Sequence, residues 1–412
     1  MNLPHLVHLA RARSLALLSA GLAVLASCGG SDGMSGPTAD LSGTVSEATK
    51  TTPIAGAIVV VGPRETTTAA DGAYQLLGIP VGEATLTVTA PGYEVFAQTV
   101  SVEAGANQRD VPMAVKTFYE FGQYGAYIPP FTETLRGIVV LIGGFDGGWL
   151  SVVRGSEYPP SFPQAAALHA ALRAFAQEQG FAVLGEAVPR EAVPDGPTLV
   201  RPALTSLAGA VSHHPELQQA PVLLLGGSWG GCRAYEYVGA EGPRVIGFIT
   251  VKGGCHPVTS QPLAHPVPGY LFIGGDDTFA RIENLTTAFE VNRSAGALWA
   301  LAVEQGAGHT FPADLGLMFE WMAAVVSLRL PESVTPGEPV VLRTIDEEGG
   351  WLGDRGTFAI CGFDCYSGNP GDAAWLPSAE TATRWASFVS ATPTGPPALR
   401  GASVGRPLFP SD

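Results

Sequence analysis

The chain has 412 residues, more than the roughly 100–200 of one ordinary domain, which predicts two folded units with tails. It is 46% hydrophobic and 14% charged, so it can bury a sizeable core and is not intrinsically disordered. Its net charge is −15 with only 22 basic residues, which argues against nucleic-acid binding, because that function requires clustered Lys and Arg. The 52 glycines and 34 prolines follow no repeat and predict many tight turns.

The first 27 residues have the pattern of a secretory signal. Arg11 and Arg13 precede an apolar run, Leu15 to Leu25, that is long enough for a signal h-region and short for a membrane span. The run ends in Leu25-Ala26-Ser27-Cys28, which resembles the lipobox of bacterial lipoproteins. That resemblance implies cleavage before Cys28, which would then carry the lipid. The alternative is an ordinary secretory signal with an incidental cysteine.

The residue after Cys28 bears on the membrane that would hold the protein. It is Gly29, not the aspartate that favours inner-membrane retention in Gram-negative lipoproteins. We therefore expect a lipoprotein anchored to the bacterial outer membrane, facing the periplasm or the outside. Residues 28–39 are rich in Gly, Ser, Asp, Pro and Thr and predict a flexible tether.

Without Cys28 the chain keeps four cysteines, an even number that permits two disulfides in an oxidising compartment. Three pairings are possible. We favour Cys232–Cys255 and Cys361–Cys365, because the latter two are close in sequence. Buried free thiols and a zinc site are alternatives, although no C-x-x-C or paired-His spacing supports zinc. We expect neither a metal nor another cofactor.

Residues 40–116 predict a small β-sandwich. Turn signals such as Asp71-Gly72 and Pro91-Gly92 separate four β-rich runs, which are Gly56–Val61, Tyr74–Leu77, Ala84–Thr89 and Val95–Val102. The motifs Leu41–Val45, Ile54–Ala57, Ala70–Tyr74 and Ala90–Tyr93 resemble the carboxypeptidase regulatory-like domain, a transthyretin-like β-sandwich. The resemblance leaves two roles open, carbohydrate or partner binding and a stiff spacer, of which we favour the spacer.

Residues 117–330 predict a mostly parallel sheet covered by helices. Six apolar runs suit strands that are buried on both faces: Gly137–Ile142, Phe181–Leu184, Val222–Leu225, Val245–Val251, Tyr270–Ile273 and Leu298–Val303. Helical spacing appears between and after them, as in Leu168, Leu172 and Phe175, and again in Leu315, Met318, Met322 and Val325. In such α/β folds, ligands bind at the carboxyl ends of the strands.

The pattern G-x-S-x-G occurs three times, around Ser31, Ser228 and Ser403. Ser31 lies in the tether and Ser403 in a proline-rich tail, whereas Ser228 follows the run Val222–Leu225. A helix is predicted directly after it, over Trp229–Val238. A nucleophile elbow needs this strand–turn–helix context, with small residues around the serine. Ser228 is therefore the candidate nucleophile, and the elbow has its glycines at 226, 230 and 231.

In this context the region from 118 to 330 resembles the α/β-hydrolase superfamily, in which the acid and then the histidine follow the serine along the chain. That order leaves His256, His265 and His309 as candidate bases, and His309 is favoured because it follows the last apolar run. The acid is expected after Tyr270–Ile273, where Asp276 and Asp277 are adjacent. The G-x-x-D pattern favours Asp277, with Asp276 as the alternative.

The resemblance also implies two backbone N–H groups that stabilise an oxyanion. One belongs to Trp229. The other is expected in the loop Gly143–Gly148, which is similar to the family's His-Gly-x motif with Gly143 in place of the histidine. The Phe145 N–H is then the candidate, and a plain glycine-rich turn is the alternative.

Residues 331–412 contain Trp351, Trp375 and Trp385 and show no obvious strand. We favour an accessory lobe over a cap whose tryptophans line an acyl or sugar pocket. The chain as a whole is expected to be an extracytoplasmic serine hydrolase, most simply a carboxylesterase acting on a small-molecule or polymeric ester. A serine peptidase of the same fold and a non-catalytic surface binding protein remain the alternatives.

Overall fold

The computed structural model describes residues 37–143, 148–156, 158, 162, 164–188 and 195–391. Several sequence predictions lie outside these residues, namely the signal segment, most of the tether, Cys28, Ser31, Phe145 and Ser403. Among the residues described, no helix is both long and apolar enough to cross a membrane.

The N-terminal unit is a sandwich of two four-stranded sheets around its own apolar core. One sheet has the order β4-β1-β7 with β8 also paired to β1, and the other has the order β3-β2-β5-β6. The four predicted runs correspond to β2, β4, β5 and β6. The bounds are β1 (Thr38–Glu47), β2 (Ile58–Val61), β3 (Arg64–Thr67), β4 (Ala73–Pro80), β5 (Gly82–Thr89), β6 (Phe96–Val102), β7 (Gly105–Gln108) and β8 (Val111–Met113).

The second unit is built on an eight-stranded sheet of order β16-β15-β14-β13-β11-β12-β10-β9. β10 runs antiparallel to both of its neighbours and every other pair is parallel. The six predicted strands are β11 to β16, and the sequence did not predict β9 and β10. The bounds are β9 (Phe118–Phe121), β10 (Tyr124–Tyr127), β11 (Gly137–Ile142), β12 (Phe181–Glu186), β13 (Val222–Gly227), β14 (Val245–Val251), β15 (Gly269–Gly274) and β16 (Trp299–Glu304).

Helices cover both faces of this sheet, which is the α/β architecture predicted. Successive residues of β11 point to opposite faces, so Val139 and Leu141 join one core while Ile138, Val140 and Ile142 join the other. The first core lies under α1 (Gly148–Arg154), α2 (Ala165–Gln179), α6 (Leu315–Arg329) and α7 (Ala379–Val389). The second lies under α3 (Gly196–Ala210), α4 (Trp229–Glu241) and α5 (Phe279–Arg293).

The C-terminal lobe packs against the edge strand β16. The expectation of no strand there was wrong, because a small sheet forms from β17 (Trp351–Gly353), β18 (Ile360–Gly362) and β19 (Ala374–Leu376). Each of these strands has only three residues, too few to show a periodic pattern in the sequence. The Trp385 indole N–H donates to the Leu301 carbonyl of β16 at 2.8 Å. Trp375 and Trp385 are each 1% exposed, so both mainly pack the lobe. Trp385 also lines part of a small pocket of about 150 Å³ beside Leu301 and Phe358.

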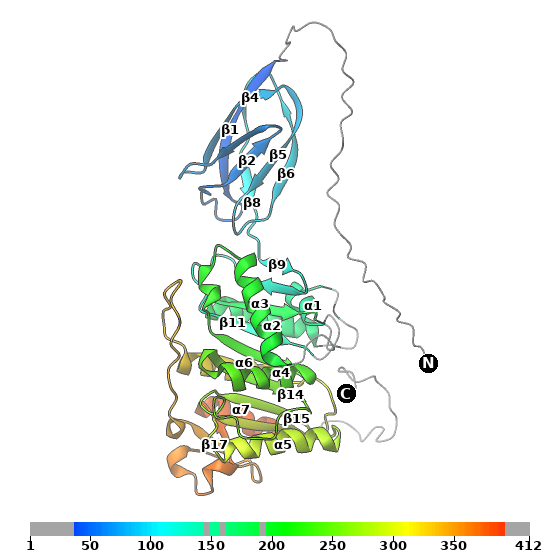
Figure 1. Cartoon of the computed structure of the whole chain (residues 1–412), viewed down its shortest axis with the longest axis vertical. Coiled ribbons are helices and arrows are strands. Elements are labelled where there is room, and N and C mark those ends of the chain that lie inside the picture. The colour runs from blue at the N-terminus through cyan, green and yellow to red at the C-terminus, as the bar shows by residue number, and fades with distance from the viewer. Residues whose placement is uncertain are drawn as a thin grey trace, which may run out of the picture.

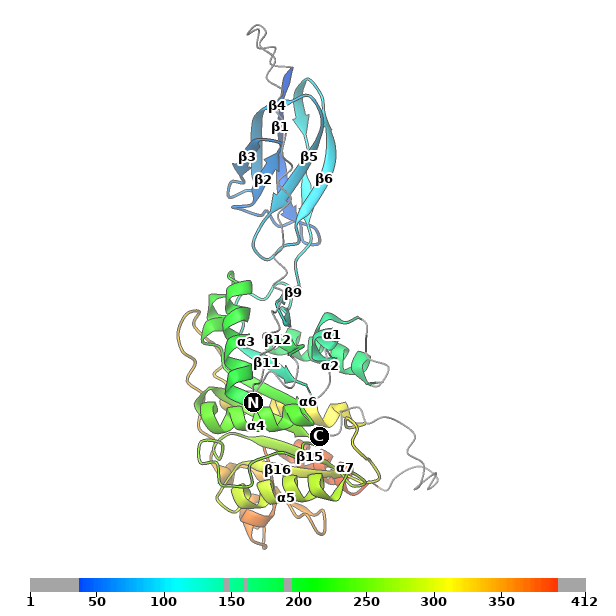
Figure 2. The same ribbon diagram turned by 45° about the vertical axis from the view of Figure 1, so that its right-hand side comes forward.

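The sandwich and the C-terminal lobe lie at opposite ends of the molecule (Figures 1 and 2). In Figure 1 the sandwich lies at the end where β9 begins the large sheet, and β17 lies at the far end, below β15. Short 3-10 helices complete the fold at Pro215–Gln218, Gly242–Arg244, Glu347–Gly349, Phe363–Cys365 and Pro370–Asp372. The loops that follow the carboxyl ends of the parallel strands carry the candidate active site.

Candidate active site

Ser228 occupies a sharp turn between β13 and α4. Its backbone φ is 51° and its ψ is −122°, a conformation that side-chain-bearing residues seldom adopt. Two backbone hydrogen bonds hold the turn: the Ser228 N–H donates to the Val251 carbonyl at 2.7 Å, and the Gly231 N–H donates to the Ser228 carbonyl at 2.9 Å. This is the geometry of a nucleophile elbow.

The glycines around the elbow are required by close packing. A Cβ at Gly226 would lie 2.3 Å from the Gly230 carbonyl oxygen, and one at Gly230 would lie 2.1 Å from the Ile142 carbonyl oxygen. The helix predicted over Trp229–Val238 is longer in the structure and continues through Gly239. α4 continues to Glu241, because a glycine in a helix weakens it without breaking it.

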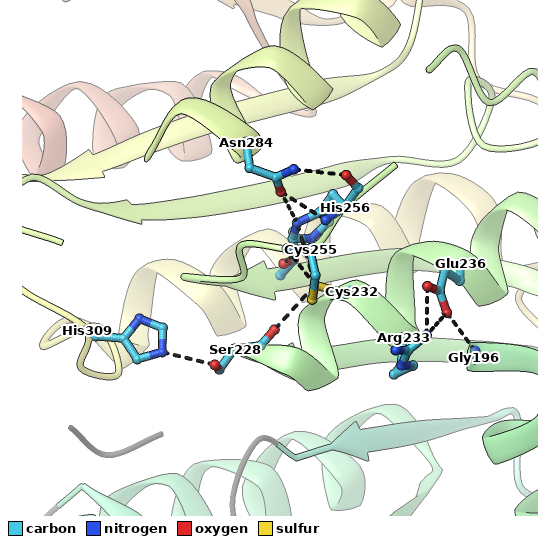
Figure 3. Close-up of a disulfide and its surroundings, with 10 residues drawn as sticks. Gly196, Ser228, Cys232, Arg233, Glu236, Cys255, His256, Asn284 and His309 are labelled. Carbon is cyan, nitrogen blue, oxygen red and sulfur yellow. Dashed lines mark hydrogen bonds and ion pairs between the residues drawn. A yellow bond between two sulfur atoms is a disulfide. The ribbon is translucent and has the colours of Figure 1, made fainter. Parts of the chain in front are cut away.

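Ser228 is linked through His309 to Asp277. His309 Nε2 lies 2.9 Å from Ser228 Oγ, and His309 Nδ1 lies 2.7 Å from Asp277 Oδ2. The three side chains come from loops after β13, β15 and β16, and Figure 3 shows His309 reaching across to Ser228. The side chains of His309 and Asp277 are 6% and 3% exposed, and Ser228 is 2% exposed. A hydroxyl, an imidazole and a carboxylate in this order can activate the hydroxyl for nucleophilic attack.

The Asp277 carboxylate is fixed by several partners besides His309. Its Oδ1 accepts the Thr278 N–H at 2.7 Å and lies 3.4 Å from Arg281 Nη1. Burial raises the pKa of Asp277, but the hydrogen bonds from His309 and Thr278 and the charges of His309 and Arg281 outweigh it and leave the pKa below its usual value. Asp276 is exposed, whereas Asp277 Oδ2 lies 2.7 Å from His309 Nδ1, so the structure places Asp277 on His309.

The other two candidate histidines lie elsewhere. His256 is 3% exposed, and its Nε2 lies 3.0 Å from Thr250 Oγ1. Its Nδ1 lies 3.3 Å from Asn284 Oδ1, and burial lowers its pKa to about 4. His265 Nε2 lies 3.1 Å from Asn292 Oδ1. Neither ring is placed to take a proton from Ser228.

Trp229 is the first residue of α4, where a backbone N–H is left outside the helical hydrogen-bond pattern. It therefore stays a candidate oxyanion donor, as predicted, while Phe145 lies outside the described residues. The loop that leads toward Phe145 begins at Gly143, whose N–H donates to Glu186 Oε1 at 2.9 Å. Sequence reasoning missed Glu186, because nothing in its neighbourhood marks a carboxylate as buried.

Both favoured cysteine pairs form disulfides in the structure. Cys232 lies one turn into α4, and its bond to Cys255 connects this helix to the loop after β14 (Figure 3). Cys232 Sγ lies 3.9 Å from the Ser228 carbonyl oxygen, so this bridge braces the helix that follows Ser228. Across the residues described, no group of three or more His, Cys, Asp or Glu side chains is arranged to hold a metal ion.

Comparison with known proteins identifies the first unit. Residues 40–115 match the family model of the carboxypeptidase regulatory-like domain. The sandwich is a carboxypeptidase regulatory-like domain. This confirms the resemblance read from its turn motifs, and the carboxypeptidase regulatory-like domain accounts for all of β1 to β8 apart from the first residues of β1. No curated protein matches the chain.

Solved structures that resemble the chain include two esterases. The esterase domain of a Rhodothermus marinus protein is 15% identical with a TM-score of 0.34, covering 51% of this chain and 95% of that one. A thermostable esterase is 11% identical with a TM-score of 0.34, covering 66% and 91%. A type II cohesin–X-dockerin complex from Acetivibrio cellulolyticus is 20% identical with a TM-score of 0.17, and the match spans 19% of this chain and 59% of that one.

Proposed function

We propose that the chain is a serine hydrolase of the α/β-hydrolase fold that cleaves carboxylic esters outside the cytoplasm. The observation that carries the proposal is the chain of hydrogen bonds from Ser228 through His309 to Asp277, with the serine at a strained elbow. A backbone conformation of this kind costs about 1–3 kcal/mol. It persists only where the surrounding structure enforces it, and such residues cluster at functional sites. A binding protein would have no need of all three groups in this order.

In the proposed reaction, Ser228 Oγ attacks the ester carbonyl carbon and its proton passes to His309 Nε2. The carbonyl oxygen becomes an oxyanion, which the Trp229 and Phe145 N–H groups stabilise. The C–O bond to the alcohol then breaks, and the alcohol leaves with the proton from His309. Water repeats the sequence on the acyl-enzyme, releasing the carboxylic acid and restoring Ser228. Asp277 holds the His309 ring in orientation and stabilises its protonated form.

An ester is favoured over a peptide because a peptidase of this fold would usually need a propeller or an acidic pocket for the peptide amine, and the sequence contains no propeller repeat. The substrate can be a small molecule or a polymer. Lipidation of Cys28 would place the enzyme at the bacterial outer membrane. The carboxypeptidase regulatory-like domain would then serve as the spacer that holds the catalytic unit away from the bilayer, in keeping with its position at one end of the molecule.

A substrate panel tests this function. The full chain, purified in a nonionic detergent, is assayed against p-nitrophenyl esters of increasing acyl length and against peptide p-nitroanilides. We expect hydrolysis of esters that is lost in Ser228→Ala and kept in Ser31→Ala and Ser403→Ala, the two other serines in G-x-S-x-G patterns. Faster cleavage of the anilides would favour a peptidase, and ester hydrolysis that survives in Ser228→Ala would refute the proposed mechanism.

A further inference from the structure

Lys252 is a buried cation directly behind the nucleophile elbow. It follows Val251, whose carbonyl accepts the Ser228 N–H, and its own backbone has φ 52°. The side chain is fully buried, with 0% of it exposed. Burying an ammonium costs free energy of folding unless charged and polar partners surround it. The contacts of Lys252 therefore indicate its role.

Those contacts lead to the loop that carries His309. Lys252 Nζ lies 2.6 Å from Glu304 Oε2 and 3.4 Å from Thr310 Oγ1, the residue next to His309. The other carboxylate oxygen of Glu304, Oε1, accepts the Ala313 N–H at 2.9 Å. The Lys252 ammonium and the Glu304 carboxylate thus connect Glu304, which precedes His309, to Thr310 and Ala313, which follow it.

The backbone of Glu304 also contacts the loop that carries the acid. Glu304 is the last residue of β16, and its carbonyl accepts the Gly275 N–H at 2.9 Å, two residues before Asp277. The Asp276 N–H donates to the Ala307 carbonyl at 2.9 Å, which joins the acid loop to the histidine loop. Three strand-end loops therefore meet around the Lys252–Glu304 ion pair.

We propose that Lys252 and Glu304 are positioning residues that hold His309 within reach of Ser228, an inference that rests on the proposed function. The segment from 305 to 314 has no helix or strand of its own and includes Gly306 at φ 72°, so it needs such ties. Burial lowers the pKa of Lys252, whereas the negative charges of Glu304 and Asp277 raise it. The net effect is a lowered pKa, and the ammonium is attracted by the Asp277 carboxylate, which orients His309, as well as by Glu304.

The test separates positioning from stability. Lys252→Met, Glu304→Gln and the double variant Lys252→Met/Glu304→Met are compared with Arg293→Met. Arg293 is the matched control, because its side chain is also 0% exposed and pairs with Glu347 at 2.6 Å, in a contact that involves none of the three loops. The kcat and KM for p-nitrophenyl acetate are measured at 25 °C on the full chain, and melting temperatures are recorded.

A misplacement of about 1 Å costs on the order of 100-fold in rate, so we expect Lys252→Met to lower kcat at least about tenfold with KM unchanged. The double variant should regain thermal stability, since an apolar pair often replaces a buried ion pair without loss, yet keep the low kcat. Arg293→Met should lose stability and keep the wild-type kcat. If Lys252→Met does not fold, Glu304→Gln gives the answer, because it preserves side-chain volume and the acceptor for Ala313.

Two results would overturn the inference alone. One is a double variant that regains kcat together with stability. The other is Glu304→Gln with a kcat within about twofold of the wild type, since a retained rate would mean that the charged tie does not place His309. A wild-type protein without Ser228-dependent hydrolysis would instead overturn the proposed function and this inference with it.

Discussion

Removal of the Cys232–Cys255 disulfide should lower stability by an amount set by the loop it closes. The bridge joins residues 23 apart in sequence, and it connects α4 to the loop after β14. In the chain-entropy description a closed loop of this length is worth about 3.4 kcal/mol at 25 °C. We expect Cys232→Ala/Cys255→Ala to lose about that much free energy of unfolding, or roughly 7–14 °C in melting temperature.

Activity should respond much less than stability. The elbow keeps its own backbone ties in the variant, from Ser228 N–H to the Val251 carbonyl and from Gly231 N–H to the Ser228 carbonyl. At 25 °C, where the variant stays folded, we therefore expect kcat/KM for p-nitrophenyl acetate to remain within about threefold of the wild type, which corresponds to less than about 1 kcal/mol.

The second disulfide supplies the control. Cys361 and Cys365 are 4 apart in sequence, and the same description gives about 2 kcal/mol for their loop. Urea unfolding of both double-alanine variants measures the two losses side by side. The reasoning fails if removing Cys232–Cys255 costs no more free energy of unfolding than removing Cys361–Cys365.

Three further changes test other parts of the site. Asp277→Asn should lower kcat by about 10³–10⁴-fold while Asp276→Asn stays within about twofold, and a reversed order in the ester assay would reassign the acid. Burial raises the pKa of the Glu186 carboxyl to about 7 from 4.5. The protonated carboxyl therefore contributes to the free energy of unfolding in full below pH 4.5, and this contribution is lost as the pH rises through 7. Glu186→Gln should remove this decline, of at most about 3 kcal/mol, from urea unfolding measured across that range, and an unchanged pH dependence would contradict it. Gly230→Ala, whose Cβ would lie 2.1 Å from a backbone carbonyl, should destabilise by about 1–3 kcal/mol, whereas Gly209→Ala in α3 meets nothing within 4 Å and should not destabilise in thermal melts.

The sequence predicted the strands that are buried on both faces, because each is a continuous apolar run. β11 and β14 have the predicted bounds, and β12, β13, β15 and β16 differ by two residues or fewer at each end. β9 and β10 escaped prediction, since each has four residues and the pair mixes tyrosine with glycine and glutamate. The strands of the C-terminal lobe are shorter still. Short strands owe their existence to pairing partners that a local pattern does not contain.

The sequence predicted those residues of the candidate site that belong to a recognisable motif. Strand context singled out Ser228, and chain order pointed to His309, but the G-x-x-D pattern only favoured Asp277 and left the adjacent Asp276 as an alternative. The loop geometry that turns Asp277 toward His309 separates them in the structure. Glu186 and Lys252 could not be found this way, because each is an ordinary charged residue at a strand end, and the contacts with Gly143 and Glu304 that give them a place in the site span 43 and 52 positions.

Fluorophosphonate labelling with peptide mapping tests the central claim most directly. The reagent bonds covalently to a serine that an adjacent base activates, so it reports the Ser228–His309 contact of 2.9 Å as reactivity. We predict one phosphonyl group per chain, located on the peptide that contains Ser228 and absent in both Ser228→Ala and His309→Ala. Folded wild-type protein that takes up no label, or takes it up on another residue, would contradict the account.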